Sequence, residues 1–245
     1  LALDGGGLEL PAEGTIAVFQ PPRDSDLPGL DKDRVQIIHD FKPDYDAWAG
    51  RGYDVVRTIK DRYAACIVCL PRAKAEARAV IAAACEVCDG IVVIDGQKTD
   101  GADSVLREMR DRVTVQGPIS KAHGKMFWIS EPAAEFFSDW RQGPELTEGG
   151  FWTAPGVFSA DGVDLASALL VDALPEKLGS EVADLGAGWG FLSAHALTRP
   201  DIKNLYLVEA GHMALECARR NVTDDRASFA WEDATSWEPP HRMDS

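Results

Sequence analysis

No apolar run among these 245 residues approaches the ~18 residues that a membrane-spanning helix needs. The opening stretch LALDGGGLELPAEG also lacks the basic flank and apolar core of a signal peptide. Positive charge is scarce as well, since 25 Lys and Arg stand against 40 Asp and Glu, for a net charge of −15. These absences argue against a membrane protein and against non-specific nucleic-acid binding, and they predict a globular, cytoplasmic protein.

Cysteine is sparse, with five residues, yet four of them have the spacing of a zinc ribbon. Cys66 and Cys69, followed by Cys85 and Cys88, give the pattern C-x2-C-x15-C-x2-C. The first pair lies in the apolar stretch AACIVCLP, where a strand would point residues three apart to opposite faces. The second pair lies in the last turn of an Ala-rich helical pattern. We therefore expect buried free thiols, with Cys217 another of the same kind, and no metal site.

Segments of strand type and helix type alternate along the chain, which is the pattern of parallel βαβ units. The polar, turn-rich stretch 138–150 separates two such runs, so we expect a first domain over 1–148 and a second over 149–245. The first run has expected strands at 15–19, 65–70, 90–95, 113–116 and 125–129 and expected helices at 73–88 and 102–112. The second run has expected helices at 164–174, 190–198 and 213–220 and expected strands at 181–185, 204–209 and 227–231.

The two halves have the spacing of two copies of one unit. The expected strands that end at Leu70 and Asp95 end 25 residues apart, and those that end at Leu185 and Glu209 end 24 apart. Where the later half has GAGWG, the earlier half has PRAKA, at 71–75, without glycine. We interpret this as a repeat of one fold whose first member has lost its ligand loop. The alternative is that any two βαβ units show this spacing.

The stretch VADLGAGWG, at 182–190, places glycines at three alternate positions behind a short apolar run. Gly186, Gly188 and Gly190 then lead into a helical pattern. Bare backbone and a helix N-terminus would therefore lie at the carboxyl edge of a parallel sheet, where ligands bind.

The residues around this glycine loop indicate the kind of ligand. Glu209 ends the next strand, where it can accept hydrogen bonds from ribose hydroxyls, and Asp233 follows the third strand, where it can meet the amine of an adenine. A dinucleotide fingerprint would need glycine or alanine at Phe191, so the spacing favours a ligand without a pyrophosphate. Trp189 either walls the ligand or packs on the following helix.

These motifs resemble the cofactor motifs of class I S-adenosylmethionine-dependent methyltransferases. In that family the glycine loop passes under the methionine part, the acidic strand end holds the ribose and the third motif holds the adenine. The stretch FWTAPGVFSADGVDLASALL, at 151–170, narrows the resemblance to the RsmC-type ribosomal RNA guanine-N2 methyltransferases of the methyltransferase small domain family. The resemblance implies cofactor contacts from Asp184, Gly186, Ala187, Gly188, Gly190, Glu209, Ala210, Asp233 and Ala234, and a cap over substrate or cofactor from Pro155, Gly156, Val157, Phe158 and Ser159.

RsmC-type enzymes pair a degenerate methyltransferase-like domain with an active one. The resemblance therefore implies an α/β fold of two Rossmann-like methyltransferase units, the first degenerate and the second truncated after its third strand. It also implies S-adenosylmethionine as the cofactor, guanine N2 of ribosomal RNA as the target, and ribosomal RNA or the small ribosomal subunit as the partner. Two other functions stay open: an NAD-dependent oxidoreductase, which the glycine spacing disfavours, and a non-catalytic binding protein that retains the cofactor fold.

One stretch of the first domain could contact RNA despite the acidic composition. SKAHGK, at 120–125, could form a basic edge that faces RNA, with Lys121 and Lys125 as the contacts. The alternative is a solvated loop.

The family's Asn/Asp-Pro-Pro-Phe/Tyr motif, which holds the amine being methylated, follows a fourth strand and is absent from these residues. Pro239 and Pro240 do not supply it, because no strand pattern precedes them and no aromatic residue follows. We therefore assign no catalytic residue and expect the 245-residue chain to be inactive. Because the fourth strand would pair with the far side of the first, the strand at 182–185 is expected to be an open, unpaired edge.

Overall fold

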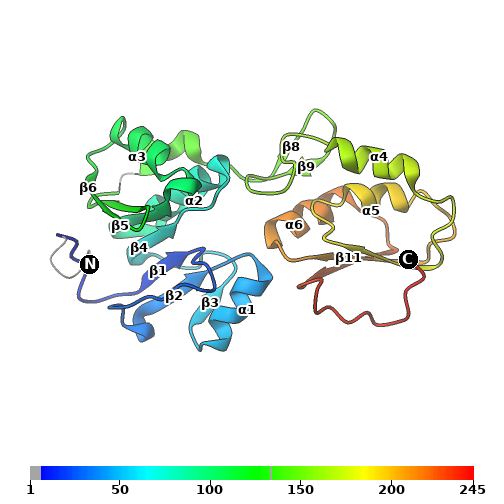
Figure 1. The fold of residues 1–245 in the computed structure, drawn as a ribbon, viewed down its shortest axis with the longest axis horizontal. Helices are drawn as coiled ribbons and strands as arrows, with labels where there is room; N and C mark the ends of the chain where they lie inside the picture. Colours follow the sequence, from blue (N-terminus) through cyan, green and yellow to red (C-terminus); the bar gives the residue numbers. More distant parts are fainter. Residues whose placement is uncertain (1–6, 133) are drawn as a thin grey trace. The chain divides into compact units, whose positions relative to one another are not determined.

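The computed structural model describes residues 7–132 and 134–245, which form two compact units (Figure 1). The first unit contains the described residues up to His39 together with Asp44–Gln142, and the second contains Asp40–Pro43 and Gly143–Ser245. The change from one unit to the other at Gln142 falls within the polar stretch 138–150. Among the described residues, no helix has both the length and the apolar character that a membrane crossing requires.

The first unit is built on a mixed seven-stranded sheet with the order β3-β2-β1-β4-β5-β7-β6. Neighbouring strands from β3 through β5 are parallel, while β7 runs antiparallel to both β5 and β6. The strands are β1 (Ile16–Phe19), β2 (Val35–Ile38), β3 (Asp54–Val56), β4 (Tyr63–Cys69), β5 (Cys88–Gln97), β6 (Gln116–Lys121) and β7 (Gly124–Ile129).

Apolar side chains cover both faces of this sheet. On one face α2 (Lys74–Val87), α3 (Ala102–Arg110) and the 3-10 helix η3 (Ala134–Trp140) form a core with alternate residues of β1, β4 and β5. In α2 the buried Ala77, Ile81, Ala84 and Cys85 recur at helical spacing, which explains why this stretch folds as a helix against the sheet. On the other face Trp48 of α1 (Lys42–Gly50) packs on β1 and β2. Two further 3-10 helices are η1 (Lys32–Arg34) and η2 (Lys98–Asp100).

The sequence predicted most of these elements but not all of them. The expected strand at 113–116 is wrong, because Val113 and Val115 pack on the core as a connection and the strand begins at Gln116. The elements β2, α1 and β3 were not predicted. Four of the five expected strands in this unit and both expected helices are confirmed within a few residues.

The second unit contains a parallel three-stranded sheet with the order β10-β11-β12. Its strands β10 (Glu181–Leu185), β11 (Asn204–Glu209) and β12 (Ala227–Trp231) confirm the three expected ranges. In Figure 1 the helices α5 and α6 lie over one face of this sheet. The helices are α4 (Leu165–Ala173), α5 (Phe191–Ala196) and α6 (His212–Asn221), and a short antiparallel pair is formed by β8 (Glu145–Leu146) and β9 (Trp152–Thr153).

The edge of this sheet at β10 differs from the expectation of an unpaired strand. The Asp244 N–H donates to the Glu181 carbonyl at 2.8 Å, and the Ala183 N–H donates to the Ser245 carbonyl at 2.9 Å. The Asp244 carboxylate also accepts hydrogen bonds from the Ser180 and Glu181 N–H groups. Residues 244–245 therefore cover the first half of β10, on the side where a fourth strand was expected.

The strand registers of the two units identify which segments correspond. Phe19 pairs with Ile38 in the first unit, as Leu185 pairs with Val208 in the second. The residues that follow these two strands form equivalent hydrogen bonds. The Gln20 N–H donates to Ile38 O at 2.9 Å, and the Gly186 N–H donates to Val208 O at 2.8 Å. The counterpart of GAGWG is therefore QPPRD, at 20–24.

The expected pairing of GAGWG with PRAKA is wrong. PRAKA follows β4, which lies on the other side of β1 in the sheet, whereas GAGWG follows the strand that corresponds to β1. The near-equal separation of the strand ends, 25 and 24 residues, does not identify corresponding strands, because strand-helix-strand units of ordinary size share it.

Candidate functional site

The glycine loop turns the chain sharply at the end of β10. Gly186, Gly188 and Gly190 have φ angles of +79°, +56° and +85°, a left-handed conformation that costs glycine little and other residues more. The N–H groups of Gly186 and Ala187 both donate to the Val208 carbonyl, at 2.8 and 3.1 Å. The turn is thereby tied to the neighbouring strand.

The three glycines serve two different purposes. A Cβ built on Gly186 or Gly188 would meet no protein atom within 4 Å, so the space beside both residues is open. A Cβ on Gly190 would lie 3.0 Å from Val222 Cγ2 and 3.3 Å from Ala218 Cβ, which means that α6 packs against this backbone. The first two glycines therefore leave a cradle for a ligand, and the third allows close helix packing.

Two carboxylates lie at the carboxyl ends of β10 and β11, next to the glycine loop in the chain or in the sheet. Glu209 accepts a hydrogen bond from the Gly188 N–H at 2.8 Å and another from the Gly211 N–H at 2.7 Å, so it fixes the loop and the corner after β11. Half-buried Asp184 accepts a hydrogen bond from the Ser193 hydroxyl at 2.7 Å. Burial raises the pKa of Asp184 and the charge of Glu209 raises it further, against the lowering effect of Ser193. Both carboxylates are thus engaged by donors of the protein beside the glycine loop.

A pocket of about 190 Å³ opens above the cradle. It brings together predicted residues from the loop, from Glu209 and from the 155–159 segment, and it adds residues of α4 and α5. Its lining comprises Phe158, Ser159, Asp164, Ser167, Gly186, Ala187, Gly188, Trp189, Phe191, Leu192 and Glu209.

Of the two roles that the sequence left open for Trp189, packing on the following helix is observed, and contact with the ligand stays a prediction. Its ring lines the pocket but is only 4% exposed, and it contacts the rings of Phe151 and Phe191. Its indole N–H donates to the Phe158 carbonyl at 3.1 Å. Trp189 therefore anchors the 155–159 segment over the glycine loop, while the Phe158 side chain itself is 71% exposed.

Several predicted residues lie outside the pocket lining. Pro155, Gly156 and Val157 form the turn that leads into it, and Ala210 follows Glu209 at the corner. The Asp233 carboxylate accepts hydrogen bonds from the N–H and hydroxyl of Thr235, in a turn after β12 that also contains Ala234.

The pocket also contains residues that the sequence reasoning missed. Asp164 accepts a hydrogen bond from the Ser167 N–H at 2.9 Å and so caps the N-terminus of α4. An aspartate before an apolar run predicts such a cap, but a cap alone does not indicate that the residue faces a ligand site.

The segment Asp40–Pro43 supports the corner after β11 within the second unit. The Lys42 N–H donates to the Ala210 carbonyl and the His212 N–H donates to the Asp40 carbonyl, both at 2.8 Å. The Trp231 indole N–H donates to the Ala210 carbonyl at 2.7 Å. These bonds hold in place the backbone that positions Glu209.

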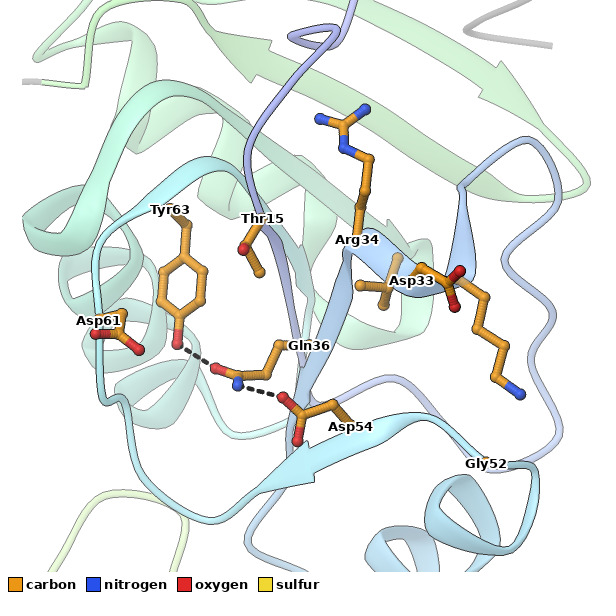
Figure 2. Close-up of a pocket in the computed structure, with 10 residues that line it drawn as sticks. Thr15, Asp33, Arg34, Gln36, Gly52, Asp54, Asp61 and Tyr63 are labelled. Carbon is orange, nitrogen blue, oxygen red and sulfur yellow. Dashed lines mark hydrogen bonds between the residues drawn. The ribbon is translucent and has the colours of Figure 1, made fainter.

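A different pocket, of about 360 Å³, lies at the amino ends of β1 to β4 in the first unit (Figure 2). The Tyr63 hydroxyl donates to Gln36 Oε1 and the Gln36 amide donates to Asp54 Oδ2, each at 2.6 Å. Arg34 donates to the carbonyls of Gly14 and Pro11 instead of pointing into this chain of bonds. Because these groups satisfy one another, and because ligands bind at the opposite edge of parallel sheets, we interpret the network as structural.

The cysteines are free thiols and mostly lie where the strand and helix patterns predict, except that Cys88 begins β5 and does not belong to the last turn of α2, and that Cys69 is only partly buried. Cys66 belongs to the core on one face of the sheet and Cys69 to the core on the other face. Burial raises the pKa of Cys69 and of Cys85 to about 12, and the Cys88 thiol donates to the Ile91 carbonyl. Among the described residues, no group of three or more His, Cys, Asp or Glu side chains could hold a metal ion.

Known proteins resemble this chain in sequence and in structure. Residues 148–245 match the family described as "Methyltransferase small domain". The chain is 29% identical over 172 residues to "Ribosomal RNA small subunit methyltransferase C" of Aeromonas hydrophila, covering 66% of this chain and 50% of that protein. It is 40% identical over 89 residues to "Ribosomal RNA large subunit methyltransferase G" of Shewanella amazonensis, covering 34% of this chain and 23% of that protein. This chain therefore spans half the length of these relatives or less.

A solved structure shows the same fold over most of the chain. It is the T. thermophilus 16S rRNA N2 G1207 methyltransferase (RsmC) in complex with AdoMet and guanosine, with a TM-score of 0.72. The match covers 91% of this chain and 66% of that chain at 20% identity. The sequence matches thus relate residues 148–245 to the methyltransferase small domain family and the chain to RsmC-type enzymes, and the structural match shows that the chain shares the fold of one of them.

Proposed function

We propose that this chain binds S-adenosylmethionine in the second unit and serves a methyltransferase that modifies guanine N2 of ribosomal RNA. The open cradle beside Gly186 and Gly188, with Glu209 next to it, carries the proposal. The Glu209 carboxylate already accepts hydrogen bonds from two backbone N–H groups. Because each carboxylate oxygen has two lone pairs, Glu209 can also accept hydrogen bonds from a ribose diol. The homologues named above support the choice of cofactor and of RNA.

The spacing of the glycine loop suits this cofactor better than a dinucleotide. S-adenosylmethionine carries a sulfonium and an ammonium group, and its sulfonium supplies an activated methyl group. Glu209 lines the pocket and could accept hydrogen bonds from the ribose of either cofactor, so this carboxylate does not separate them. Phe191, however, occupies the position where a dinucleotide fingerprint needs glycine or alanine. This observation disfavours the oxidoreductase alternative.

In the transfer that we propose, the guanine amine nitrogen attacks the methyl carbon in line as the carbon–sulfur bond breaks, and the amine then gives up a proton. Because the amine is a weak nucleophile, the protein contributes positioning and a polar acceptor. The 245 residues contain no Asn/Asp-Pro-Pro-Phe/Tyr motif to provide that acceptor. We therefore propose that they hold the cofactor without transferring its methyl group, as a non-catalytic binding protein would.

Two measurements on the purified chain test this proposal. Isothermal titration calorimetry should detect binding of S-adenosylmethionine or S-adenosylhomocysteine and none of NAD; binding of NAD alone would refute the cofactor assignment. A radiolabelled methyl-transfer assay on ribosomal RNA, with the protein mass checked by mass spectrometry, should show no turnover. Robust turnover by the 245-residue chain would refute the role assigned to the missing motif.

A further inference from the structure

The tip of the β6–β7 hairpin in the first unit gathers basic side chains. A depression of about 380 Å³ at this tip is lined by Lys98 of η2, by Asp103 of α3 and by the hairpin residues from Ser120 to Lys125. We call Lys98, Ser120, Lys121, His123 and Lys125 the basic tip. It is a local concentration of positive charge in a chain whose net charge is −15.

The backbone of the hairpin tip is held in one conformation. Ala122 and His123 both have left-handed φ angles, of +49° and +65°, as a two-residue turn of type I′ requires. The Lys98 N–H donates to the His123 carbonyl at 3.0 Å, which ties the turn to η2. The basic side chains therefore project from a fixed base, so a ligand need not order the loop.

The charges at the tip are only partly compensated. Lys125 forms an ion pair with Asp103, whose pKa is lowered by this contact and further by the charges of Lys98 and Arg107. Within residues 7–132 and 134–245, neither Lys98 nor Lys121 forms an ion pair. Three basic side chains, those of Lys98, Arg107 and Lys125, thus act on one carboxylate.

The strand register spreads the cations over both faces of the hairpin. Ser120 pairs with Lys125 and Lys121 pairs with Gly124, so the two lysines belong to opposite faces although both border the depression. A flexible polyanion that crosses the tip can therefore contact lysines on both faces. The hydroxyl of Ser120 and the imidazole of exposed His123 add further donors.

We propose that the basic tip binds phosphate groups of the backbone of the substrate RNA. This inference rests on the proposed function, since it assigns the RNA a second contact outside the cofactor-binding unit. Ammonium groups neutralise phosphates without reading sequence, so the tip orients the RNA while recognition of the target base occurs elsewhere.

The test compares two double variants with the same change in charge. Lys98→Ala with Lys121→Ala removes the two exposed cations that form no ion pair, and Lys177→Ala with Lys203→Ala removes two exposed lysines of the second unit. Affinity for a ribosomal RNA fragment is measured by fluorescence anisotropy at several KCl concentrations. The tip variant should bind about 10-fold more weakly, and its slope of log K against log salt should fall by roughly 1 to 2, because each lost phosphate contact removes about 0.7 to 0.9.

The control variant should retain nearly the wild-type slope, and both should bind S-adenosylmethionine as the wild type does. Equal losses in the two variants, or none in the tip variant, would overturn the inference while leaving the cofactor assignment standing. Absence of cofactor binding by the wild type would instead refute the proposed function. Unchanged melting temperatures in both variants would show that the loss of RNA binding is not a loss of folding.

Discussion

The two units contain corresponding turns that lead to different surfaces. After β1, Gln20 adopts a φ of +51° and donates to the next strand as Gly186 does after β10. Two residues later the first unit has Pro22 where the second has Gly188, and proline has no N–H with which to hold a carboxylate. The strand end also differs, with His39 in the first unit where the second has Glu209. The two units thus share the first residue of the turn, while the first unit lacks the glycine and the carboxylate that form the cradle in the second.

This comparison indicates what a cofactor site needs beyond its fold. The first unit keeps the parallel order of its first three strands and the register between the first two, so the sheet alone does not create the site. The candidate site in the second unit has open space at two glycines and a carboxylate, Glu209, that accepts the Gly188 N–H. We propose that the first unit, lacking both, does not bind S-adenosylmethionine.

The largest expected effect comes from adding one methyl group to the cradle. Gly188→Ala should weaken S-adenosylmethionine binding by about 100-fold, because roughly 1–2 kcal/mol of left-handed strain adds to a Cβ in the ligand's space. Calorimetry measures the change. Gly150→Ala is the matched control, since Gly150 also has a left-handed φ, of +81°, and open space around it, but lies outside the pocket lining. Equal losses in both variants would mean that strain, and not the cradle, governs binding.

A smaller loss is expected from Glu209→Gln. The amide has one acceptor oxygen, whereas Glu209 accepts from two backbone N–H groups and is proposed to accept from the ribose as well. Affinity for S-adenosylmethionine should fall by about 10- to 100-fold, corresponding to ~1–3 kcal/mol. Exposed Glu238→Gln carries the same charge change and should leave affinity unchanged. Wild-type affinity in the Glu209→Gln variant would show that this carboxylate does not contribute to cofactor binding.

How much of this could be read from the sequence depends on how local each signal is. The glycine loop and Glu209 were predicted because a turn and a strand end are defined by a few neighbouring residues. By contrast, β2 and β3 contain only four and three residues, and they form because they pair with strands distant in the chain. Pairing of GAGWG with QPPRD required the register of the sheet, which spacing along the chain does not contain.

The roles of aromatic residues near the loop were equally hard to predict. Trp189 could be assigned either to the ligand or to packing, and the structure shows that it packs on Phe191 of α5 and lines the pocket, while its indole N–H donates to Phe158 O. Trp189→Phe should therefore lower the free energy of unfolding by about 1 kcal/mol through loss of this hydrogen bond. Chemical denaturation measures the change. A variant as stable as the wild type would show that the 155–159 segment does not depend on this contact.

The smallest expected effect is on pH dependence. Because burial raises the pKa of Asp184, the folded state holds this proton more tightly than the unfolded chain. The free energy of unfolding should therefore decline as pH rises from the ordinary value of 3.8 through the raised pKa. Asp184→Asn should abolish the contribution of this group to the decline, while its side-chain oxygen can still accept the hydrogen bond from the Ser193 hydroxyl. Thermal unfolding between pH 4 and 7 measures it, and parallel curves for variant and wild type would contradict the assignment.

The asymmetry between the units is tested most directly by the stoichiometry of S-adenosylmethionine binding to the intact chain. Calorimetry should give one site per chain, lost or strongly weakened in Gly188→Ala and unchanged in Pro22→Ala, the corresponding position of the first unit. Two sites per chain, or one site that responds to Pro22→Ala and not to Gly188→Ala, would contradict the assignment of the cofactor to the second unit.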